Sequence, residues 1–341
     1  MLDHKGGFVA KARRVTATDV AREAGVSQAT VSYVLNDTPH QKIAEATRQR
    51  ILAAAERLGY APSAAARALR NGRSDVVLCL LPDWPISLAV GSLLEHLSAA
   101  LAAEQLSLVA HPHARNDRPI AELWKAITPA AVIAFDDFPP KDAAAMRAAG
   151  IELTVSLLDR SSRQGREFGT PQERSGRLQA EHLAANGHQH LGYAFPDNPR
   201  VHNLARMRLD GVRLACADLG LDEPVVHAVP LHAESAAEAV HAWRAADTPV
   251  TGICAFNDNT ALAVLAGLRP LGLSAPDDLA VIGVDDTPAA ELAATPLTTV
   301  VIDLQAVAQY LAQAIVRALA GEPAPSRPGS DIVHLIRRAS A

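Results

Sequence analysis

Aromatic residues make up only 4% of the 341 residues, cysteines number three, and no apolar run is long enough to span a bilayer. Cys79, Cys216 and Cys254 are far apart and each lies among apolar neighbours, which argues against a disulfide framework or a zinc site and favours core packing. The first 14 residues lack the apolar segment of a secretory signal. We therefore expect a cytoplasmic protein that does not associate with membranes.

Signatures of enzymes are also missing. The sequence contains no G-x-S-x-G, no P-loop and no G-x-G-x-x-G. Two histidine pairs, 111/113 and 188/190, have no acidic or thiol residues nearby, so exposed histidines at strand edges are favoured over a metal site. We expect neither catalytic activity nor a metal or other cofactor.

Charge is distributed unevenly along the chain. The net charge is −5 overall, but residues 1–74 carry +6 and residues 75–341 carry −11. A basic head on an acidic body is typical of a DNA-binding module joined to another domain. The length suits two or three domains, and hydrophobic residues, at 49%, suffice for sizeable cores.

The basic part contains two short predicted helices around a tight turn, within residues 15–36. Thr16 and Asp19 have the spacing of a capping box, and Gly25 supplies the residue that ends the first helix. Ser27 is placed to cap the second helix. A third helix is expected over 44–58, where Ala44 occupies the cap position without a capping side chain.

The second of these helices has one apolar and one polar face. Val31, Val34 and Leu35 are spaced to point inward, which leaves the start of the helix and its outer face polar. This pattern suits insertion into a DNA major groove, with an ordinary surface helical hairpin as the alternative. The outward residues are Gln28, Ala29, Ser32 and Tyr33.

From residue 75 onward, predicted strands and helices alternate. Apolar runs predict strands near 75–81, 106–110, 131–135, 151–157, 190–195, 225–229, 251–256 and 279–284. Helices are expected near 87–103, 118–127, 140–149, 173–186, 203–219, 233–246, 258–271 and 304–320. Repeated βα units indicate doubly wound sheets, and this number of strands indicates two lobes.

Ligands of open α/β sheets bind beyond the carboxyl ends of the strands. The polar and aromatic candidates at these positions are Asp83, Trp84, Asp136, Arg208, Asn257 and Asp285. Carboxylates, amides and a planar guanidinium suit vicinal hydroxyl groups, which predicts a sugar-like or nucleoside-like ligand. For the neighbouring Asp258 and Asp286, capping of the following segment is favoured over contact with a ligand. For Asn257 and Asp285, a structural role remains open as an alternative to ligand contact. Trp84 suits packing between the lobes as well as it suits stacking on a ligand.

Several segments together resemble the lac repressor family (LacI/GalR) of bacterial transcription regulators. The segments DVAREAGVS, TVSYVLN, ATRQRILAAAERLGYAPSAAARAL and VIGVDDTPAAELAATPLTTV occur in the order found in that family. The resemblance implies an all-α helix-turn-helix head and a body of two doubly wound lobes similar to periplasmic sugar-binding proteins. It also implies three connections between the lobes, expected near 158–162, 286–291 and 320–330.

The resemblance implies a domain division as well. We expect an arm at 1–14, a helix-turn-helix domain at 15–61, a hinge helix and linker at 62–74, and an effector-binding and dimerisation domain at 75–341. The N-lobe would comprise about 75–159 and 303–326, and the C-lobe about 160–302 and 327–341. The dimer face would include the helices at 87–103 and 258–271.

Individual residue roles follow from the same resemblance. Arg208, Asn257 and Asp285 match effector-contacting positions, and Leu69 matches a residue wedged into the minor groove. The DNA-binding residues would be Thr16, Ser27, Gln28, Ala29, Thr30, Ser32, Tyr33, Asn36, Ser63, Ala66, Leu69 and Arg70. The chain departs from the family at Leu157, at Thr170-Pro171-Gln172 and at Trp84-Pro85-Ile86, which replace polar groups used by sugar-responsive members.

These features predict a homodimeric repressor that binds a palindromic operator and responds to a small ligand in the cleft between the lobes. The alternatives within the same fold are an effector-independent repressor and an activator. A pure ligand-binding protein is disfavoured by the N-terminal module, and an enzyme by the lack of a catalytic constellation.

Overall fold

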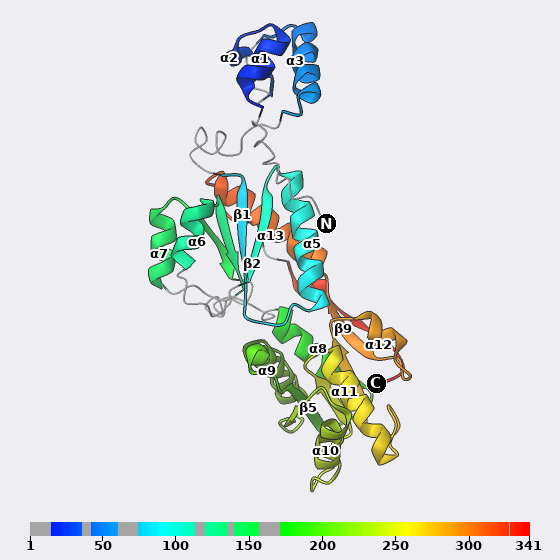
Figure 1. The fold of residues 1–341 in the computed structure, drawn as a ribbon. Coiled ribbons are helices and arrows are strands. Elements are labelled where there is room, and N and C mark those ends of the chain that lie inside the picture. The colour runs from blue at the N-terminus through cyan, green and yellow to red at the C-terminus, as the bar shows by residue number, and fades with distance from the viewer. Residues whose placement is uncertain are drawn as a thin grey trace, which may run out of the picture. The chain divides into compact units, whose positions relative to one another are not determined.

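The structure, a computed structural model, describes residues 15–35, 42–60, 74–112, 120–135, 140–156, 171–326 and 328–341. The chain divides between Asp75 and Val76 into two compact units, called here the head and the body. Figure 1 shows the order of their elements. None of the described helices combines the length and the apolar character needed to cross a membrane.

The head consists of three helices whose ends are set by local hydrogen bonds. They are α1 (Ala17–Ala24), α2 (Gln28–Leu35) and α3 (Glu45–Arg57). Thr16 and Asp19 form the capping box, in which the Thr16 amide donates to Asp19 Oδ2 at 2.9 Å. Gly25 ends α1 in the left-handed region at φ 64°, and Ser27 Oγ accepts the Thr30 amide at 3.1 Å. These predicted caps are therefore confirmed, and Ala44 provides no side-chain cap for α3, as expected.

A small apolar core holds the three head helices together. Val20, Val31 and Ile51 are fully buried at its centre, together with alanines from α1 and α3. An ion pair of 3.2 Å between Arg57 and Glu23 links α3 to α1 at the surface. Burial of Val31 and Val34 confirms the predicted inward face of α2 and leaves its other face outward.

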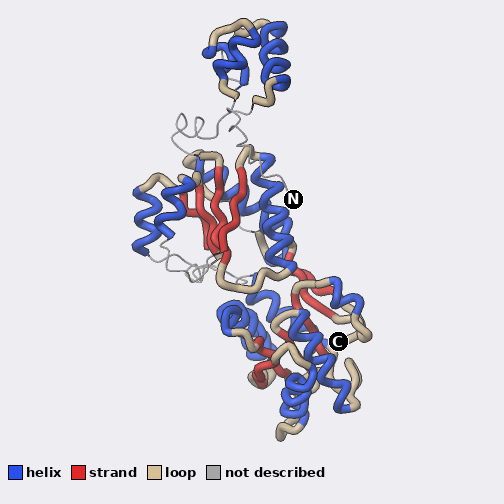
Figure 2. The backbone as a smooth tube through the Cα atoms, viewed as in Figure 1, coloured by secondary structure: helices blue, strands red, loops and turns tan. Residues whose placement is uncertain are grey.

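The first part of the body, the N-lobe, is a four-stranded parallel sheet in the order β2-β1-β3-β4. Its strands are β1 (Val76–Leu81), β2 (Ser107–Pro112), β3 (Ala131–Ala134) and β4 (Glu152–Ser156). Val77 and Cys79 pack under α5 (Leu88–Ala103) and α13 (Leu304–Leu319). Leu78 and Leu80 face the opposite core, toward α6 (Ile120–Ile127) and α7 (Pro140–Ala148). Helices thus cover both faces of the sheet (Figure 2).

The second part, the C-lobe, is a six-stranded sheet in the order β10-β9-β8-β7-β5-β6. The strands are β5 (Leu191–Pro196), β6 (Val225–Val229), β7 (Gly252–Ala255), β8 (Ala280–Val284), β9 (Thr298–Ile302) and β10 (Val333–Ile336). One face packs on α8 (Pro171–Ala185) and α9 (His202–Leu219), and the other on α10 (Ala233–Arg244) and α11 (Asp258–Leu268). Only β10 runs antiparallel among the described pairs.

Three elements at the end of the chain were not predicted. They are the short helix α12 (Pro288–Leu292), β9 and β10. The expected lobe connection near 286–291 is wrong, because α12 leads into β9 of the same C-lobe sheet. The chain instead reaches the N-lobe between β9 and α13, whose Leu311 and Ile315 lie in the N-lobe core. The connection expected near 158–162 lies outside the described residues.

Candidate functional site

A cleft in the body lies at the carboxyl ends of several strands of both sheets. It has a volume of about 980 Å³ and is lined by residues that follow β1, β3, β5, β7 and β8 and by the first turns of α5, α8 and α13. This position is where open α/β sheets bind ligands. The volume lies at the upper end of the range for sites that hold drug-sized molecules.

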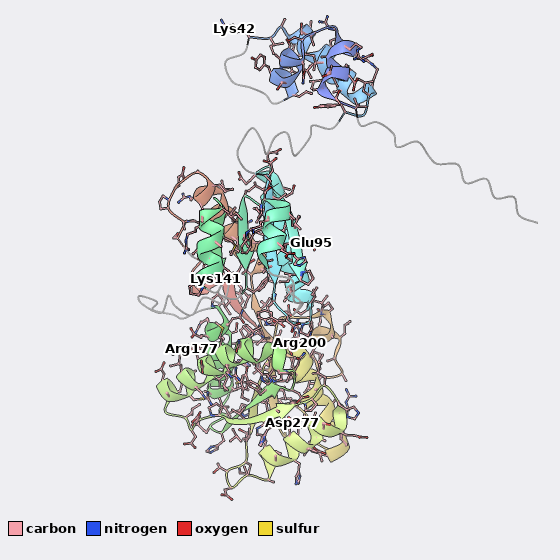
Figure 3. All side chains as sticks on the ribbon, turned by 60° about the vertical axis from the view of Figure 1, so that its left-hand side comes forward. Lys42, Glu95, Lys141, Arg177, Arg200 and Asp277 are labelled. Atoms are coloured by element: carbon pink, nitrogen blue, oxygen red, sulfur yellow. The ribbon has the colours of Figure 1, made fainter. Side chains whose placement is uncertain are left out.

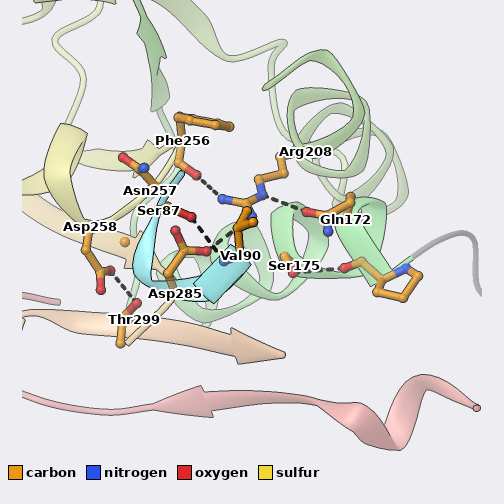
Figure 4. A network of polar contacts seen from close by, with 12 residues as sticks. Ser87, Val90, Gln172, Ser175, Arg208, Phe256, Asn257, Asp258, Asp285 and Thr299 are labelled. Carbon is orange, nitrogen blue, oxygen red and sulfur yellow. Dashed lines mark hydrogen bonds and ion pairs between the residues drawn. The ribbon is translucent and has the colours of Figure 1, made fainter. Parts of the chain in front are cut away.

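Arg208 is the centre of the polar network on the C-lobe side of the cleft (Figure 4). Its side chain emerges from α9 and is almost fully buried, with 4% of the residue exposed. Nε donates to Gln172 Oε1 at 2.9 Å, Nη1 donates to the Phe256 carbonyl at 2.6 Å, and Nη2 approaches Asp285 Oδ1 at 3.3 Å. The guanidinium also lies 5.0 Å from the centre of the Phe256 ring. These contacts hold the arginine in one orientation.

Asp285 meets Arg208 from the end of β8 through a strained backbone. Its φ of 113° lies in the left-handed region that L-residues rarely adopt. Its amide donates to the Val300 carbonyl at 2.8 Å, which fixes the turn. Burial raises the pKa of the Asp285 carboxyl, and the neighbouring Arg208 opposes that rise. Strain at a cleft position marks the turn as a functional candidate.

The residue that caps α11 is Asn257, not Asp258. Asn257 caps α11, because its Oδ1 accepts the Thr260 amide and hydroxyl at 3.0 Å each. The described residues supply no partner for its Nδ2, which is the group left for a ligand. The capping interpretation of Asp258 is wrong: its carboxylate turns inward and accepts from Thr299 Oγ1 at 2.6 Å and from the Thr287 amide at 2.7 Å. Burial raises the pKa of Asp258 to about 6.

The capping interpretation of Asp286 is also wrong. Thr287 occupies the cap position of α12, and Asp286 forms an ion pair of 2.7 Å with Arg338, beyond the end of β10. Asp286 nevertheless lines the cleft.

Gln172 joins the site because α8 and α9 approach each other unusually closely. A Cβ on Gly176 of α8 would overlap the main-chain oxygen of Arg208, and a Cβ on Gly211 of α9 would overlap that of Glu173. Two glycines therefore allow the backbones to touch, which brings the first turn of α8 beside Arg208. Gly211 follows Arg208 by three residues, so the close approach of the two helices gives a packing reason for a glycine at this position.

The N-lobe side of the cleft carries aromatic and aliphatic side chains together with the polar residues Ser87, Ser92 and His96. Trp84 and Phe135 both line it, with their ring centres 5.6 Å apart at an angle of 72°. Ile86 and Leu88 also line it and are 64% and 66% exposed. Asp83 is not among the lining residues and pairs with Arg200, in the 3₁₀ turn Pro199–Val201 that follows β5, at 3.4 Å. This ion pair connects the two lobes within the body. Arg200 is labelled in Figure 3.

The structure brings together four of the six residues expected to contact an effector. Trp84, Arg208, Asn257 and Asp285 line one cleft, whereas Asp136 lies outside the described residues. Sequence reasoning missed Gln172 and Phe256 as partners of Arg208. In the sequence, Gln172 was noted only as a departure from the family pattern. Phe256 accepts the hydrogen bond with its main-chain carbonyl, and a sequence pattern of side chains does not predict such a contact.

The head presents the start and one face of α2 outward. Gln28 and Ala29 are exposed, Tyr33 is 39% exposed, and Ser32 is half-buried. Of the other expected DNA-binding residues, Thr16 and Ser27 act as caps, and Thr30 Oγ1 lies 2.8 Å from Ser27 Oγ. Asn36, Ser63, Ala66, Leu69 and Arg70 lie outside the described residues.

His111 is exposed on the edge strand β2, as expected, and His113 lies outside the described residues, whereas the pair 188/190 differs from the expectation. His188 is half-buried and its Nδ1 lies 3.1 Å from Thr251 Oγ1, and His190 approaches Asp222 at 3.6 Å. In the part of the chain that the structure describes, no group of three or more His, Cys, Asp or Glu side chains is arranged to hold a metal ion.

Comparison with known proteins decides the family. Residues 16–63 match the family described as "Bacterial regulatory proteins, lacI family", and residues 180–341 match a "Periplasmic binding protein-like domain". The chain is 30% identical over 291 residues to the transcriptional repressor PurR of Photobacterium profundum, covering 84% of this chain and 86% of that protein. The chain belongs to the lacI family of bacterial regulatory proteins.

Further relatives of this lacI-family protein agree. The transcriptional regulator DegA of Bacillus subtilis is 28% identical over 295 residues, covering 84% of this chain and 86% of DegA. A crystal structure of the lac repressor dimer bound to operator and the anti-inducer ONPF has the same fold, with a TM-score of 0.74 at 22% identity over 96% of this chain and 99% of that one. The lacI-family protein is thus a DNA-binding transcription regulator, with a helix-turn-helix head and a periplasmic-binding-protein-like body.

Proposed function

We propose that this lacI-family protein is a homodimeric repressor whose α2 helices read the two halves of a palindromic operator. The observation that carries the proposal is the exposed start of α2, where Gln28 and Ala29 face outward. Ser27 caps this helix, and Val31 packs in the head core. A glutamine amide can bond two atoms of adenine, and an alanine can contact only an apolar edge such as a thymine methyl.

The proposed dimer rests on the body. We place the dimer face on α5 and on the segment 258–271, and exposed leucines border that segment. Leu292 of α12 is 83% exposed, and Leu271 is also exposed. Large apolar side chains in contact with water favour burial against a second copy. A two-fold dimer then presents two heads to operator half-sites about one DNA turn apart.

We propose further that a small ligand in the body cleft changes operator affinity. The support is the placement of Arg208, Asn257 and Asp285 on one wall and Trp84 on the other, so that a ligand contacts both lobes. Preferential binding to one arrangement of the lobes shifts the population toward that arrangement. A coupling of about 1–3 kcal/mol corresponds to a change in operator affinity of roughly 5- to 150-fold.

One specific observation supports the alternative, an effector-independent repressor. Gln172, the Phe256 carbonyl and Asp285 already provide partners for Arg208 from within the chain. The guanidinium of Arg208 therefore has three partners without a ligand.

The test is selection of the purified protein on random-sequence DNA at a stated salt concentration. We expect enrichment of a palindrome with a symmetric centre. Gln28→Ala should relax the preference at one base pair in each half-site, at a cost of about 1–3 kcal/mol per contact. Gln49→Ala, at an exposed position of α3, is the matched control and should select the wild-type sequence. Failure to enrich any sequence, or loss of preference in both variants alike, would contradict the proposal.

A further inference from the structure

Two neighbouring strands of the C-lobe sheet separate at their carboxyl ends, behind the polar network of the cleft. The ladder between β7 and β8 ends at Cys254 opposite Ile282, although both strands continue beyond this pair. On their far sides they stay paired, β7 with β5 and β8 with β9. The strand ends 255–257 and 283–285 are called here the β7–β8 fork. Main-chain groups that face into this fork need partners from outside the sheet.

Arg208 of α9 bridges the two sides of the fork (Figure 4). Its Nη1 donates to the Phe256 carbonyl at 2.6 Å, and its Nη2 approaches Asp285 Oδ1 at 3.3 Å. A planar guanidinium holds its two Nη atoms at a fixed separation, so both contacts form only at one width of the fork. A displacement of about 1 Å between the strand ends lengthens one contact beyond hydrogen-bond range. The geometry of the site therefore depends on whatever fixes the fork.

Gln179 of α8 bridges the same fork from behind the cleft. Its side chain is fully buried, and it is not among the residues that line the cleft. Its Nε2 donates to the carbonyl of Ala255 at 2.8 Å and to those of Ile282 and Gly283 at 3.1 Å each. One amide from a neighbouring helix thus supplies donors to both strand ends, within two residues of each contact of Arg208.

The unpaired oxygen of Gln179 argues against a role limited to packing. Gln179 Oε1 is buried and has no hydrogen-bond partner among the described residues. An unpaired buried acceptor destabilises a fold. An apolar side chain would avoid that cost but would leave the carbonyls of the fork without a donor. The residue therefore contributes through the position of its amide rather than through its volume.

Strain in the neighbouring turn makes such a restraint necessary. Asp285 and Asp286 have φ values of 113° and 50°, in the left-handed region. Non-glycine residues keep such values only where the surrounding structure fixes them. Gln179 holds the end of β8 immediately before this turn. Without that contact, the turn can relax and Asp285 can move away from Arg208.

We propose that Gln179 is a positioning residue of the cleft, which sets the width of the β7–β8 fork and thereby the contact between Arg208 and Asp285. It acts through main-chain carbonyls and does not touch a ligand. The proposal rests on the proposed function only in taking the cleft as the effector site. Its test uses the free protein, so the result is independent of any operator or effector.

The test measures hydrogen–deuterium exchange, resolved to single residues, on the full-length protein. The amides of Phe256 and Asp285, called here the fork amides, lie on opposite sides of the fork and donate to the carbonyls of Ala194 and Val300 at 3.0 and 2.8 Å. Gln179→Met removes the donors and keeps an unbranched side chain of similar length. Exchange of both fork amides should become on the order of tenfold or more faster, because the buried carbonyls lose their donors and the fork opens locally.

Leu183→Ala is the matched control on the same helix. Leu183 lies one turn beyond Gln179, is fully buried, and has its Cδ atoms 3.2 Å from where a Cβ on Gly252 would lie. It therefore supports the beginning of β7, at the end of this strand opposite the fork. Its truncation should destabilise the C-lobe and speed exchange of the amides of Thr251 and Ala280, which bond near the strand starts, while the fork amides exchange as in the wild type.

Reaction of Arg208 with phenylglyoxal gives a second, local readout. The residue is 4% exposed, so it should react slowly in the wild type. In Gln179→Met the guanidinium loses its fixed partners and should react severalfold faster, measured by peptide mapping relative to the exposed Arg206 of the same helix. In Leu183→Ala the ratio of the two reactivities should stay at the wild-type value.

Two outcomes overturn the proposal. One is wild-type exchange of the fork amides and wild-type reactivity of Arg208 in Gln179→Met. The other is an equal change at the fork in Gln179→Met and Leu183→Ala, which would reflect a general loss of stability.

A smaller substitution covers the case in which Gln179→Met does not fold. Gln179→Asn withdraws the same amide by one methylene and should show the same changes to a smaller degree, so wild-type behaviour of this variant would count equally against the proposal. If the fork responds as expected but no operator is enriched, the positioning role stands and the proposed function fails.

Discussion

At the scale of single residues, the carboxylate of Asp258 is the clearest case of a buried charge held for a structural purpose. It accepts hydrogen bonds from the amide of Thr287 and the hydroxyl of Thr299, and so links both residues to the start of α11. The strained turn at Asp285 and Asp286 lies between β8 and these partners. Asp258 therefore supports the cleft without lining it, as a positioning residue for the turn.

The raised pKa of Asp258 predicts a specific dependence of stability on pH. A carboxyl with a pKa of about 6 in the folded state and 3.8 in the unfolded state binds its proton more tightly when folded. Its ionisation penalises the folded state above pH 6, and the penalty is relieved as the pH falls from about 6 to about 4. The wild-type protein should therefore gain up to about 3 kcal/mol in unfolding free energy over this range relative to Asp258→Asn.

The measurement is urea denaturation of both proteins at several pH values between 4 and 7. The asparagine keeps an acceptor for Thr287 and a donor for Thr299, so its unfolding transition remains cooperative. Titration of all other groups is common to both proteins and cancels in the difference. A difference that stays constant with pH, or that changes in the opposite direction, would show that Asp258 titrates near its ordinary pKa.

Individual residues also show where sequence reasoning reaches its limit. Asparagine and aspartate cap helices about equally well, so the pattern could not decide which of Asn257 and Asp258 caps α11. The deciding partner, Thr299, is 41 positions away. Gln179 of α8 is another example: fully buried, it donates to the carbonyls of Ala255, Ile282 and Gly283 at the ends of β7 and β8. Only the fold reveals that these three oxygens meet.

At the scale of elements, local patterns predicted most of the helices and strands. Continuous apolar runs identified the parallel strands, and capping signals located α1 and α2. The elements missed at the end of the chain are short. In addition, β10 pairs with β9 although all of α13 lies between them in the sequence. Pairing between such distant segments depends on tertiary structure rather than local preference.

The contact between α8 and α9 gives a prediction at this scale. Gly211→Ala should destabilise the body by several kcal/mol, because the added Cβ overlaps the main-chain oxygen of Glu173 and forces the helices apart. The shift should also move Gln172 away from Arg208, and ligand affinity should fall in any surviving folded protein. Thermal unfolding measures the loss of stability, and titration with sugars and nucleosides measures the change in ligand affinity.

Gly91→Ala is the matched control for this substitution. Gly91 lies on an exposed face of α5, and a Cβ there meets no atom within 4 Å. Alanine is the better helix former, so this variant should be as stable as the wild type or more stable by about 0.5–1 kcal/mol. Equal effects of the two substitutions would mean that helix propensity, rather than the close approach of α8 and α9, determines the result.

At the scale of the whole molecule, the head and the body are separate compact units with separate cores. Such a small helical head has a small core and is correspondingly marginal in stability. Removal of buried apolar volume there should unfold the head alone, while the body keeps its own transition.

Ile51→Ala tests this independence. Ile51 is fully buried in the head core, and its truncation costs about 2–5 kcal/mol, which is enough to unfold a marginal domain. Operator binding should be lost, whereas the main transition of the body in calorimetry should remain at the same temperature. Leu52→Ala, at the adjacent and exposed position, should retain operator binding. A matching loss of the body transition in Ile51→Ala would show that the two units unfold together.

Gly283 and Asp258 carry a consequence for protein engineering. A Cβ at position 283 would occupy the space of the Asp258 carboxylate. The strand β8 and the first turn of α11 therefore accept new sequences only as a pair. A chimaera that takes its cleft from another family member must exchange the segments around both positions together, because a boundary drawn between them creates either a collision or an unfilled space beside the cleft.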